Sequence, residues 1–298
     1  MVASAIREFA VSRSPQLLAA AYFEKIIQIW NPLTQKKINE FPTIYSFGAR
    51  NLALSPDAKV LVVGRSTTSG KVAAYSVPDG KKLWEQKLIY PSRLKFTPSG
   101  DSILCSTNHR STVRLDSQIG AVLERRIGVK ELIEGPYGDS LAIPAREDKT
   151  IRLLAHAGSF DISKISFAVL DAKFSPDSVC MTEAGGPVRC FSVSNGRLQW
   201  IFDPTKGEHV LNIHYSPAHK AFFGVLKDCE RKGPSSRHLL RFDVLSGATT
   251  TICQLDSWED VFLGETDQLI TSAGAIVNLA DGEIAGRLSF PQREYPDD

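Results

Sequence analysis

Residues 171–177 read DAKFSPD, and this stretch decides the fold because close copies of it recur along the chain. Two copies are NLALSPD at residues 51–57 and RLKFTPSG at residues 93–100. Each begins with a polar residue and then places two apolar residues two positions apart before a Ser or Thr. Apolar residues at that spacing share one face of a strand, and the following Pro with Asp, Ser or Gly suits a turn. The stretch therefore predicts the first strand and first turn of a repeated β unit.

Further copies lie at residues 8–12 and 212–216, and weaker ones at residues 131–135 and 260–264. The seven copies end at residues 12, 55, 97, 135, 175, 216 and 264, which are steps of 38 to 48 residues. A period near 40–45 residues is typical of propeller blades. A short apolar strand, a third strand and a fourth strand follow each copy, and the third strand ends in a Gly turn at Gly80, Gly120, Gly196, Gly247 and Gly282. The sequence therefore predicts an all-β chain, a seven-bladed β-propeller of four-stranded antiparallel blades.

We expect a single propeller domain over residues 6–290 and a short C-terminal tail over residues 291–298. The expected blades span residues 6–42, 49–88, 92–128, 130–166, 169–204, 209–255 and 258–290. Each blade reads from its first to its fourth strand, so the two ends of the chain are not expected to share a blade. The alternative is that residues 1–6 add an outer strand.

The repeat resembles the WD-repeat family over nearly the whole chain. The best local matches are residues 25–31, KIIQIWN, and residues 148–154, DKTIRLL, with Trp30-Asn31 nearest to the Trp-Asp pair of the family. The family's Gly-His dipeptide is absent, and Asp148 alone matches the residues that bond to that His. The resemblance therefore implies a divergent member whose blades depend mainly on packing. Trp84 and Trp200, each four residues after a Gly, also resemble quinoprotein blades.

The composition is that of a globular chain that can bury a full core. The 298 residues are 43% apolar and 23% charged, and the net charge is +2. So small a charge does not favour nucleic-acid or membrane binding. Arg7 and Glu8 interrupt the N-terminal region where a secretion signal needs an apolar run, and the five cysteines are scattered. We expect a protein of the cytoplasm, or also of the nucleus in a eukaryote, and not a secreted one.

No catalytic or metal-binding signature is present in the sequence, so we expect no cofactor, no metal and no catalytic residue. His209 and His214, five residues apart on one strand, are expected on opposite faces, which disfavours a shared metal. Cys180 and Cys190 flank the turn at Gly185-Gly186, so symmetric pairing would place them side by side. Two buried thiols are favoured over a redox or soft-metal pair, because nothing nearby lowers a thiol pKa.

A polar residue stands four positions before the end of every copy, and the first strand of a WD-repeat blade is the innermost. These residues would form a ring at the mouth of the central channel: Glu8, Asn51, Arg93, Glu131, Asp171, Asn212 and Asp260. Four acids against one Arg make the mouth mildly anionic. A solvated channel lining is favoured over a cation or basic-tail site, because a ring of charges alone fixes no ligand geometry.

Two sets of loops would share the top face of such a propeller, namely those between blades and those between the second and third strands of a blade. Aromatic residues and Arg on loops are typical of binding hot spots. The candidate partner-binding residues are Tyr45, Phe47, Arg65, Tyr90, Arg93, His109, Arg110, Arg146, Asp148, His209, Arg231, Lys232 and Trp258.

The resemblance and the missing catalytic signatures favour a non-catalytic protein-interaction propeller. It would bind a protein or peptide through its top face, as a scaffold or adaptor subunit of a complex or as a dedicated inhibitor such as an immunity protein. The alternative is a propeller enzyme or small-ligand binder that uses Glu131, Asp171 and Asp260 at the channel mouth. A quinone enzyme is less favoured, because those are usually exported, and nucleic-acid binding is a distant third hypothesis.

Overall fold

A computed structural model gives the fold of the chain, in which every described secondary-structure element is a β-strand. The structure describes residues 6–12, 16–22, 26–42, 51–68, 70–107, 110–145, 150–164, 169–228, 237–255, 261–263, 267–271 and 274–288. No helix capable of crossing a membrane occurs among these residues. The chain divides into two compact units, one of residues 1–127, 270–276 and 284–298, and one of residues 128–269 and 277–283.

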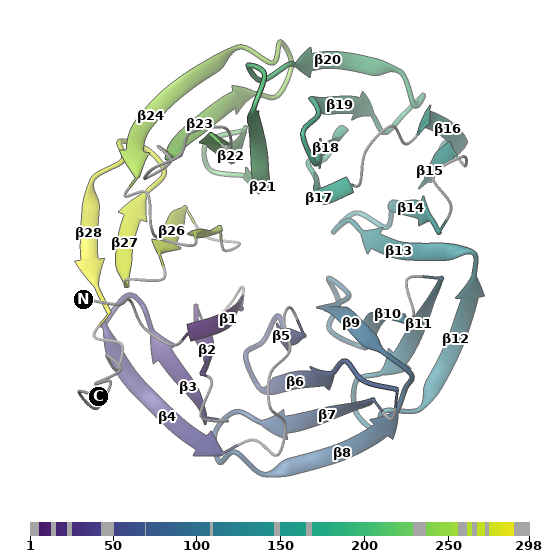
Figure 1. The fold of residues 1–298 in the computed structure, drawn as a ribbon, viewed down its shortest axis with the longest axis vertical. Helices are drawn as coiled ribbons and strands as arrows, with labels where there is room; N and C mark the ends of the chain where they lie inside the picture. Colours follow the sequence, from purple (N-terminus) through teal and green to yellow (C-terminus); the bar gives the residue numbers. More distant parts are fainter. Residues whose placement is uncertain are drawn as a thin grey trace. The chain divides into compact units, whose positions relative to one another are not determined.

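The first unit contains three complete sheets, whose strands are labelled in Figure 1. Blade 1 is built from β1 (Ile6–Val11), β2 (Leu18–Tyr22), β3 (Ile26–Asn31) and β4 (Lys36–Pro42). Blade 2 is built from β5 (Leu52–Leu54), β6 (Val60–Arg65), β7 (Lys71–Ser76) and β8 (Lys82–Lys87). Blade 3 is built from β9 (Pro91–Phe96), β10 (Ser102–Thr107), β11 (Ser111–Asp116) and β12 (Val122–Ile127).

The second unit also contains three complete sheets. Blade 4 is built from β13 (Val129–Glu134), β14 (Ser140–Pro144), β15 (Thr150–Ala155) and β16 (Gly158–Lys164). Blade 5 is built from β17 (Val169–Phe174), β18 (Ser178–Glu183), β19 (Val188–Ser192) and β20 (Leu198–Phe202). Blade 6 is built from β21 (Glu208–Ser216), β22 (Ala221–Asp228), β23 (Arg237–Asp243) and β24 (Thr249–Leu255).

A seventh sheet draws its residues from both units. It is built from β25 (Val261–Leu263), β26 (Gln268–Thr271), β27 (Ala275–Asn278) and β28 (Ile284–Arg287). The prediction of seven four-stranded antiparallel blades is therefore confirmed. Every sheet consists of four consecutive strands, so the first and last sheets share no strand among the described residues. A bond from the Arg287 backbone N–H to Gln35 Oε1, 3.4 Å long, joins β28 to the turn before β4.

The Ser or Thr of the repeated frame closes the first hairpin of its blade. Ser55 Oγ accepts the backbone N–H groups of Lys59 and Val60, at 3.1 and 2.9 Å. Ser12 Oγ accepts the N–H of Leu17 at 2.9 Å, and the frame residues of blades 3, 5 and 6 accept equivalent bonds. These hydroxyls are buried, and a buried backbone N–H needs such a partner. The repeat of Ser and Thr is thus a repeat of one turn geometry.

Blade 4 departs from this frame because it has Gly135 where blades 1, 2, 3, 5 and 6 have a hydroxyl. A Cβ at Gly135 would overlap the ring of Phe174 in β17 of the next blade. The hairpin is closed by a backbone bond from the Gly135 N–H to the Asp139 carbonyl, 2.8 Å long. The weak match of this copy therefore reflects the close approach of a neighbouring blade.

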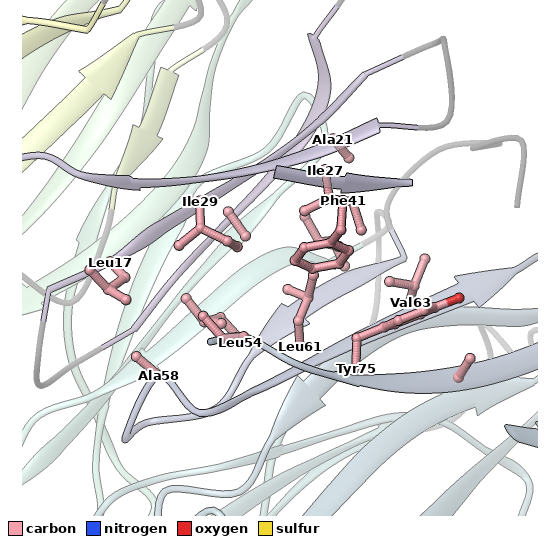
Figure 2. Packing of buried hydrophobic residues seen from close by; sticks show 14 residues of the cluster. Leu17, Ala21, Ile27, Ile29, Phe41, Leu54, Ala58, Leu61, Val63 and Tyr75 are labelled. Carbon is pink, nitrogen blue, oxygen red and sulfur yellow. The ribbon is translucent and has the colours of Figure 1, made fainter. Parts of the chain in front are cut away.

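The hydrophobic core lies between neighbouring blades. Middle strands such as β6 and β10 are buried almost throughout because their sheets are covered on both faces, whereas Trp84 is the only buried residue of the fourth strand β8. Figure 2 shows the cluster between blades 1 and 2, in which Phe41 of β4 reaches toward Leu61 and Tyr75 of blade 2. The rings of Phe41 and Tyr75 stack with centroids 5.9 Å apart. Packing of this kind removes the apolar faces of both sheets from water.

Side-chain hydrogen bonds fasten the fourth strand of one blade to the next blade. Trp84 Nε1 donates to the Ser117 carbonyl at 2.9 Å, and Trp200 Nε1 donates to the Val244 carbonyl at 2.8 Å. In blade 1, Asn39 Nδ2 donates to the Val77 carbonyl at 2.8 Å. Each acceptor is the first residue after a third strand. The blades therefore interlock at their outer strands by a shared polar contact as well as by apolar packing.

Candidate protein-interaction surface

The structure describes five of the thirteen predicted partner-binding residues. These are Arg65, Tyr90, Arg93, Arg110 and His209. The others lie outside the described residues: Tyr45, Phe47, His109, Arg146, Asp148, Arg231, Lys232 and Trp258. Arg65, Tyr90, Arg93 and Arg110 belong to blades 2 and 3, where second strands end, third strands begin and fourth strands lead to the next blade. This end of blades 2 and 3 is the part of the predicted top face that can be built from its residues.

Backbone hydrogen bonds hold the loops of this end together. The Tyr90 N–H donates to the Thr67 carbonyl and the Leu88 N–H donates to the Gly70 carbonyl, both at 3.0 Å. These bonds join the connection that leaves blade 2 to the loop between β6 and β7. A Cβ at Gly70 would collide with the carbonyl oxygens of Leu88 and Arg65, so the close approach requires glycine. The loops that carry Arg65 and Tyr90 are therefore positioned by the blade itself.

Two of the predicted residues have a left-handed backbone. Tyr90 has a φ of 47° and Arg93 a φ of 46°, and side chains other than Gly, Asn and Asp rarely adopt this conformation. Arg93 stands close to a register shift between β9 and β10, at Cys105 and Ser106. Strained residues of this kind concentrate at functional sites. The strained backbone therefore makes the connection between blades 2 and 3 a candidate functional region.

A cavity of about 420 Å³ opens beside this connection. We call it the blade 2–3 groove, and its lining includes Lys87, Leu88, Ile89, Arg110, Arg125 and Ile127. Two large aliphatic side chains stand exposed at the groove, with Ile127 84% and Ile89 57% exposed, and the adjoining Tyr90 is 41% exposed. Exposed apolar side chains gathered at a cavity are a feature of binding surfaces.

The groove is also cationic. Lys87, Arg110 and Arg125 are exposed, and none of them forms an ion pair within the part of the chain that the structure describes. The acids on the adjoining fourth strands are already engaged, because Glu85 pairs with Lys71 and Lys82 in blade 2. The positive charge of the groove is therefore not neutralised by its own blades.

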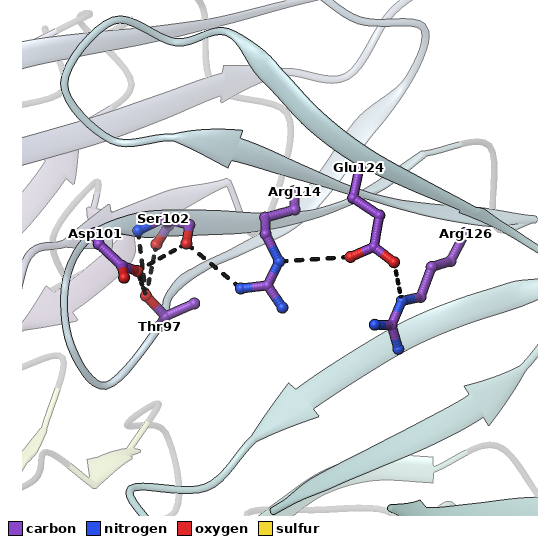
Figure 3. Close-up of polar contacts among 6 residues, drawn as sticks. All are labelled: Thr97, Asp101, Ser102, Arg114, Glu124 and Arg126. Atoms are coloured by element: carbon purple, nitrogen blue, oxygen red, sulfur yellow. Dashed lines mark hydrogen bonds and ion pairs between the residues drawn. The ribbon is translucent and has the colours of Figure 1, made fainter. Parts of the chain in front are cut away.

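Glu124 of β12 is engaged on the opposite face of its strand. Figure 3 shows its carboxylate between Arg114 and Arg126, at 3.6 and 2.6 Å from their Nε atoms. The Arg126 hydrogen bond is the main reason that the pKa of Glu124 is lowered. Side chains alternate along a strand, so Arg125 and Ile127 share the face that Glu124 and Arg126 do not use. The same face carries Val113, which is buried in the core between blades 2 and 3.

The alternation of β12 could have indicated part of this groove from the sequence. Residues 122–127 read VLERRI, which places Arg125 and Ile127 on one side of a strand. Aromatic residues and Arg on loops are the sequence signal for a binding surface. That signal does not include the loop residue Ile89 or the strand residues Lys87, Arg125 and Ile127. That residues of β12 line one cavity with Lys87 and the chain after it depends on how the blades pack.

His209 belongs to blade 6, in the second unit. Burial, followed by the Lys227 ammonium opposite it, lowers the pKa of His209. The expectation that His209 and His214 lie on opposite faces is wrong, because a register shift in β21 pairs them with Lys227 and Phe223. Those partners are four residues apart on β22, so both histidines face the same side, about 13 Å apart along the strand. That separation is too long for one metal ion.

The predicted ring residues are partly used to join blades. The Glu8 carboxylate accepts the backbone N–H groups of Asn51 and Leu52 in blade 2, the latter at 3.2 Å. Asp171 Oδ2 accepts the N–H of Ile213 in blade 6 at 3.3 Å. These residues therefore connect the first strands of adjacent blades.

The remaining ring residues differ in exposure. Asn51 and Glu131 are buried, Arg93 and Asn212 are half-buried, and Asp260 lies outside the described residues. Within the described ranges, no group of three or more His, Cys, Asp or Glu residues is arranged to hold a metal ion.

Cys180 and Cys190 are side by side, as their positions around the turn predict. They are direct partners in the pairing of β18 with β19, both are fully buried, and both are free thiols. Burial, followed by the neighbouring Cys190 thiol, raises the pKa of Cys180. Cys190 Sγ donates to Gln199 Oε1 at 3.4 Å. The raised pKa disfavours the reactive thiolate form.

Comparison with known proteins places this geometry among the WD40 propellers. No family model matches the sequence. The chain is similar to the U3 small nucleolar RNA-associated protein 21 homolog of Schizosaccharomyces pombe, with 26% identity over 197 residues. That match covers 64% of this chain and 17% of the length of the relative, so the chain corresponds to a small part of it.

Two solved structures share the fold over nearly the full chain. The β-propeller domain of Cps50 (Swd1) from Myceliophteria thermophila aligns with a TM-score of 0.67 and 12% identity, covering 94% of both chains. The WD40 repeats of RRP9 align with a TM-score of 0.63 and 14% identity, covering 90% of this chain and 87% of that one. The strand order, the seven blades and these alignments lead to one conclusion: the chain is a seven-bladed β-propeller with the WD40 fold.

Proposed function

We propose that the chain is a non-catalytic protein-interaction propeller that binds a protein or peptide partner at the end of blades 2 and 3 that carries Arg65, Tyr90 and Arg110. The observation that carries the proposal is the blade 2–3 groove, where exposed cations without acid partners among the described residues surround exposed isoleucines. Exposed Arg and Tyr side chains beside a cavity are typical of an interface hot spot.

The opposite end of the same blades differs from the groove end in its hydrogen bonding. Its turns between third and fourth strands bond their polar groups internally. Asp116 Oδ1 accepts the N–H groups of Gln118 and Ile119, at 2.8 and 3.0 Å, and Asp79 Oδ1 accepts the N–H of Lys81 at 3.2 Å. Groups that are already satisfied in this way offer less to a partner. The asymmetry supports binding at the groove end.

The alternative function, an enzyme or small-ligand site at the channel mouth, receives less support from the ring residues. Of its three acids, Asp171 accepts the backbone N–H of Ile213 in the next blade and Glu131 is buried. A pair of carboxylates that acts on a sugar must face the substrate across roughly 5–10 Å. An acid that holds a neighbouring strand and an acid that is buried are poorly placed for that task, so binding at the groove end is the better proposal.

The fold similarity is compatible with either form of interaction protein. A scaffold or adaptor subunit would retain several partners, whereas a dedicated inhibitor would form a tight one-to-one complex. The relative associated with a small nucleolar RNA raises a nuclear complex as one setting, and the cytoplasm is the other. A fluorescent fusion in the native cell separates the two locations.

The test is affinity capture of the tagged full chain from a native-cell lysate, with quantitative mass spectrometry. Wild type is compared with Arg65→Glu/Arg110→Glu, and with the control Lys36→Glu/Lys81→Glu. The control makes the same change in charge at exposed positions at the start of β4 and in the turn before β8. We expect stoichiometric partners with wild type and control, and their loss with the groove-end variant. Partners retained equally by all three proteins would argue against this surface, and no stoichiometric partner would argue against the function.

A further inference from the structure

We infer that the blade 2–3 groove binds an acidic peptide segment that carries an aliphatic or aromatic anchor. The inference rests on the proposed interaction function and adds the chemistry of the partner. It combines a cavity, three cations and two exposed isoleucines within blades 2 and 3 of one unit.

The size of the cavity suits a few side chains. About 420 Å³ falls in the lower part of the range for ligand sites, roughly 300–1,000 Å³. Leu88 is buried in the floor as part of the core between blades 2 and 3. Ile89 and Ile127 expose most of their surface beside it. An apolar anchor placed between these two isoleucines would remove them from water, which favours binding by the hydrophobic effect.

The charge of the groove selects the rest of the ligand. Arg110 lies in the loop between β10 and β11, Arg125 projects from β12 and Lys87 ends β8, so cations reach the cavity from three segments. None has an ion-pair partner among the residues that the structure describes. Arginine binds a carboxylate through two parallel hydrogen bonds, so Asp and Glu side chains complement this lining.

Nucleic acid fits the groove less well than an acidic peptide. Its phosphates would complement the cations, but single-stranded binding also depends on aromatic side chains that stack on the bases. The cavity lining is aliphatic, with Leu88, Ile89 and Ile127 as its apolar members. A polyanion without apolar groups would leave both exposed isoleucines uncovered. The mixed lining therefore favours a peptide that joins acids to an apolar anchor.

Hydrogen bonds within blades 2 and 3 hold the loops of the groove in place, so the groove is formed before a partner binds. The bond between Leu88 and Gly70 fixes the chain just before Ile89, and the Arg110 N–H donates to the Thr107 carbonyl at 3.1 Å. Thr107 and Ser111 share a buried hydroxyl contact of 2.6 Å across the start of the same loop. Loops held in this way lose little conformational freedom on binding, which favours affinity for a short peptide.

The test begins with selection of a phage-displayed library of random 12-residue peptides on the immobilised full chain. We expect the selected peptides to be enriched in Asp and Glu and to contain Leu, Ile or Phe. The best peptide is then synthesised with a fluorescent label, and its affinity is measured by anisotropy. We expect it to bind Arg110→Glu/Arg125→Glu at least about tenfold more weakly, while Lys36→Glu/Lys81→Glu binds as wild type does.

Two further variants separate the apolar contribution from the charge. Ile89→Ser and Ile127→Ser change exposed side chains, so they should fold as wild type does by circular dichroism. Each should weaken the selected peptide by at least about threefold. A labelled random 12-nucleotide RNA serves as the competing probe, and we expect it to bind at least about tenfold more weakly than the peptide at 150 mM salt.

Selected peptides without acid enrichment, or peptides that bind the groove variants and wild type equally, would overturn the inference. Preferential RNA binding abolished by Arg110→Glu/Arg125→Glu would overturn it in favour of a nucleic-acid groove. Failure of the peptide inference can be distinguished from failure of the proposed interaction function. If lysate partners depend on Arg65 and Arg110 while acidic peptides do not bind, only the peptide inference fails. If no lysate partner is found, the interaction function itself fails.

Discussion

At the scale of single residues, burial determines what the ionisable side chains of this chain can do. Cys105 and Cys180 lie in the cores between blades, and Glu183 lies at the end of β18 with a fully buried side chain. Desolvation disfavours the charged form of each group and raises its pKa. These residues therefore behave as structural groups.

The buried thiols should be protected from thiol reagents. Burial raises the pKa of Cys105 to about 12, so only about one molecule in ten thousand carries the thiolate at pH 8. Burial also raises the pKa of Cys180. We expect a disulfide reagent at pH 8 to leave Cys105, Cys180 and Cys190 unmodified in the native protein and to modify them after unfolding in urea. Peptide mapping by mass spectrometry identifies the labelled positions, and rapid native labelling of Cys180 would contradict the buried arrangement.

Glu183 should make stability depend on pH. Burial raises its pKa, and the ion pair with Arg189 lowers it by less. A raised native pKa means that the native state favours the protonated acid, so this contribution is present below the unfolded pKa near 4.5 and is lost as pH rises through the native value. Urea titrations of wild type and Glu183→Gln from pH 4 to 7 should show the variant gaining relative stability as pH rises. A relative loss over that range would show that the Arg189 ion pair dominates.

At the scale of elements, neighbouring blades are joined by a recurring contact between a turn of one blade and the fourth strand of the blade before it. The turn between the third and fourth strands carries a Gly that lies against a fourth-strand side chain of the preceding blade, as Gly120 lies against Trp84 and Gly247 against Trp200. The tryptophans also donate to a carbonyl of that turn. The turn glycines that mark the repeat in sequence are thus also packing positions.

Replacing Gly120 by Ala should test this fastening. Gly120 has a φ of 70°, so Ala there costs backbone strain of about 1 kcal/mol, and its Cβ would overlap the Trp84 ring. Overpacking typically costs a further 1–3 kcal/mol, so we expect a loss of roughly 2–4 kcal/mol in the free energy of unfolding. Gly185→Ala is the control, because Gly185 has a φ of 65° with no neighbour within 4 Å of the added Cβ. Equal losses in the two variants would mean that the Trp84 contact does not matter.

The junction of blades 1 and 2 should depend on the Glu8 carboxylate. It accepts the N–H groups of Asn51 and Leu52, and hydrogen bonds to a charged partner contribute about 1.5–3 kcal/mol. Glu8→Ala should lose about that amount in chemical denaturation, and Glu8→Gln should lose less because one acceptor oxygen remains. A Glu8→Ala variant as stable as wild type would show that water replaces the carboxylate at this junction.

The sequence predicts these elements well where the turn chemistry is local. The frame at residues 171–177 locates the first strands because its hydroxyl closes a hairpin within a few residues. The direct pairing of Cys180 with Cys190 follows from the turn between them. The register shift in β21 could not be predicted from the sequence. It places His209 and His214 on the same face of the strand, where opposite faces were predicted. Gly135 gave a weak match for a reason that lies in Phe174 of another blade.

At the scale of the whole molecule, the chain has the WD40 fold with few of the family's signature residues. Packing, hydroxyl-closed hairpins and tryptophan or asparagine bonds between blades take the place of the family's hydrogen-bond chain. The blade 2–3 groove arises where β12, the end of β8 and the loop before β11 line one cavity, so the loop composition predicts Arg110 and Tyr90 but not Arg125 and Ile127. Interaction sites of this type require the arrangement of blades as well as the repeat.

We expect a partner to bind at the end of blades 2 and 3 that carries the groove. The most direct measurement is hydrogen–deuterium exchange of the purified chain, alone and in complex with a partner captured from lysate. We predict slower exchange on binding at residues 65–68, 87–93 and 110–111, and unchanged exchange at residues 79–81 and 116–120 in the opposite turns. Protection confined to those opposite turns, with residues 87–93 unchanged, would show that the partner binds elsewhere.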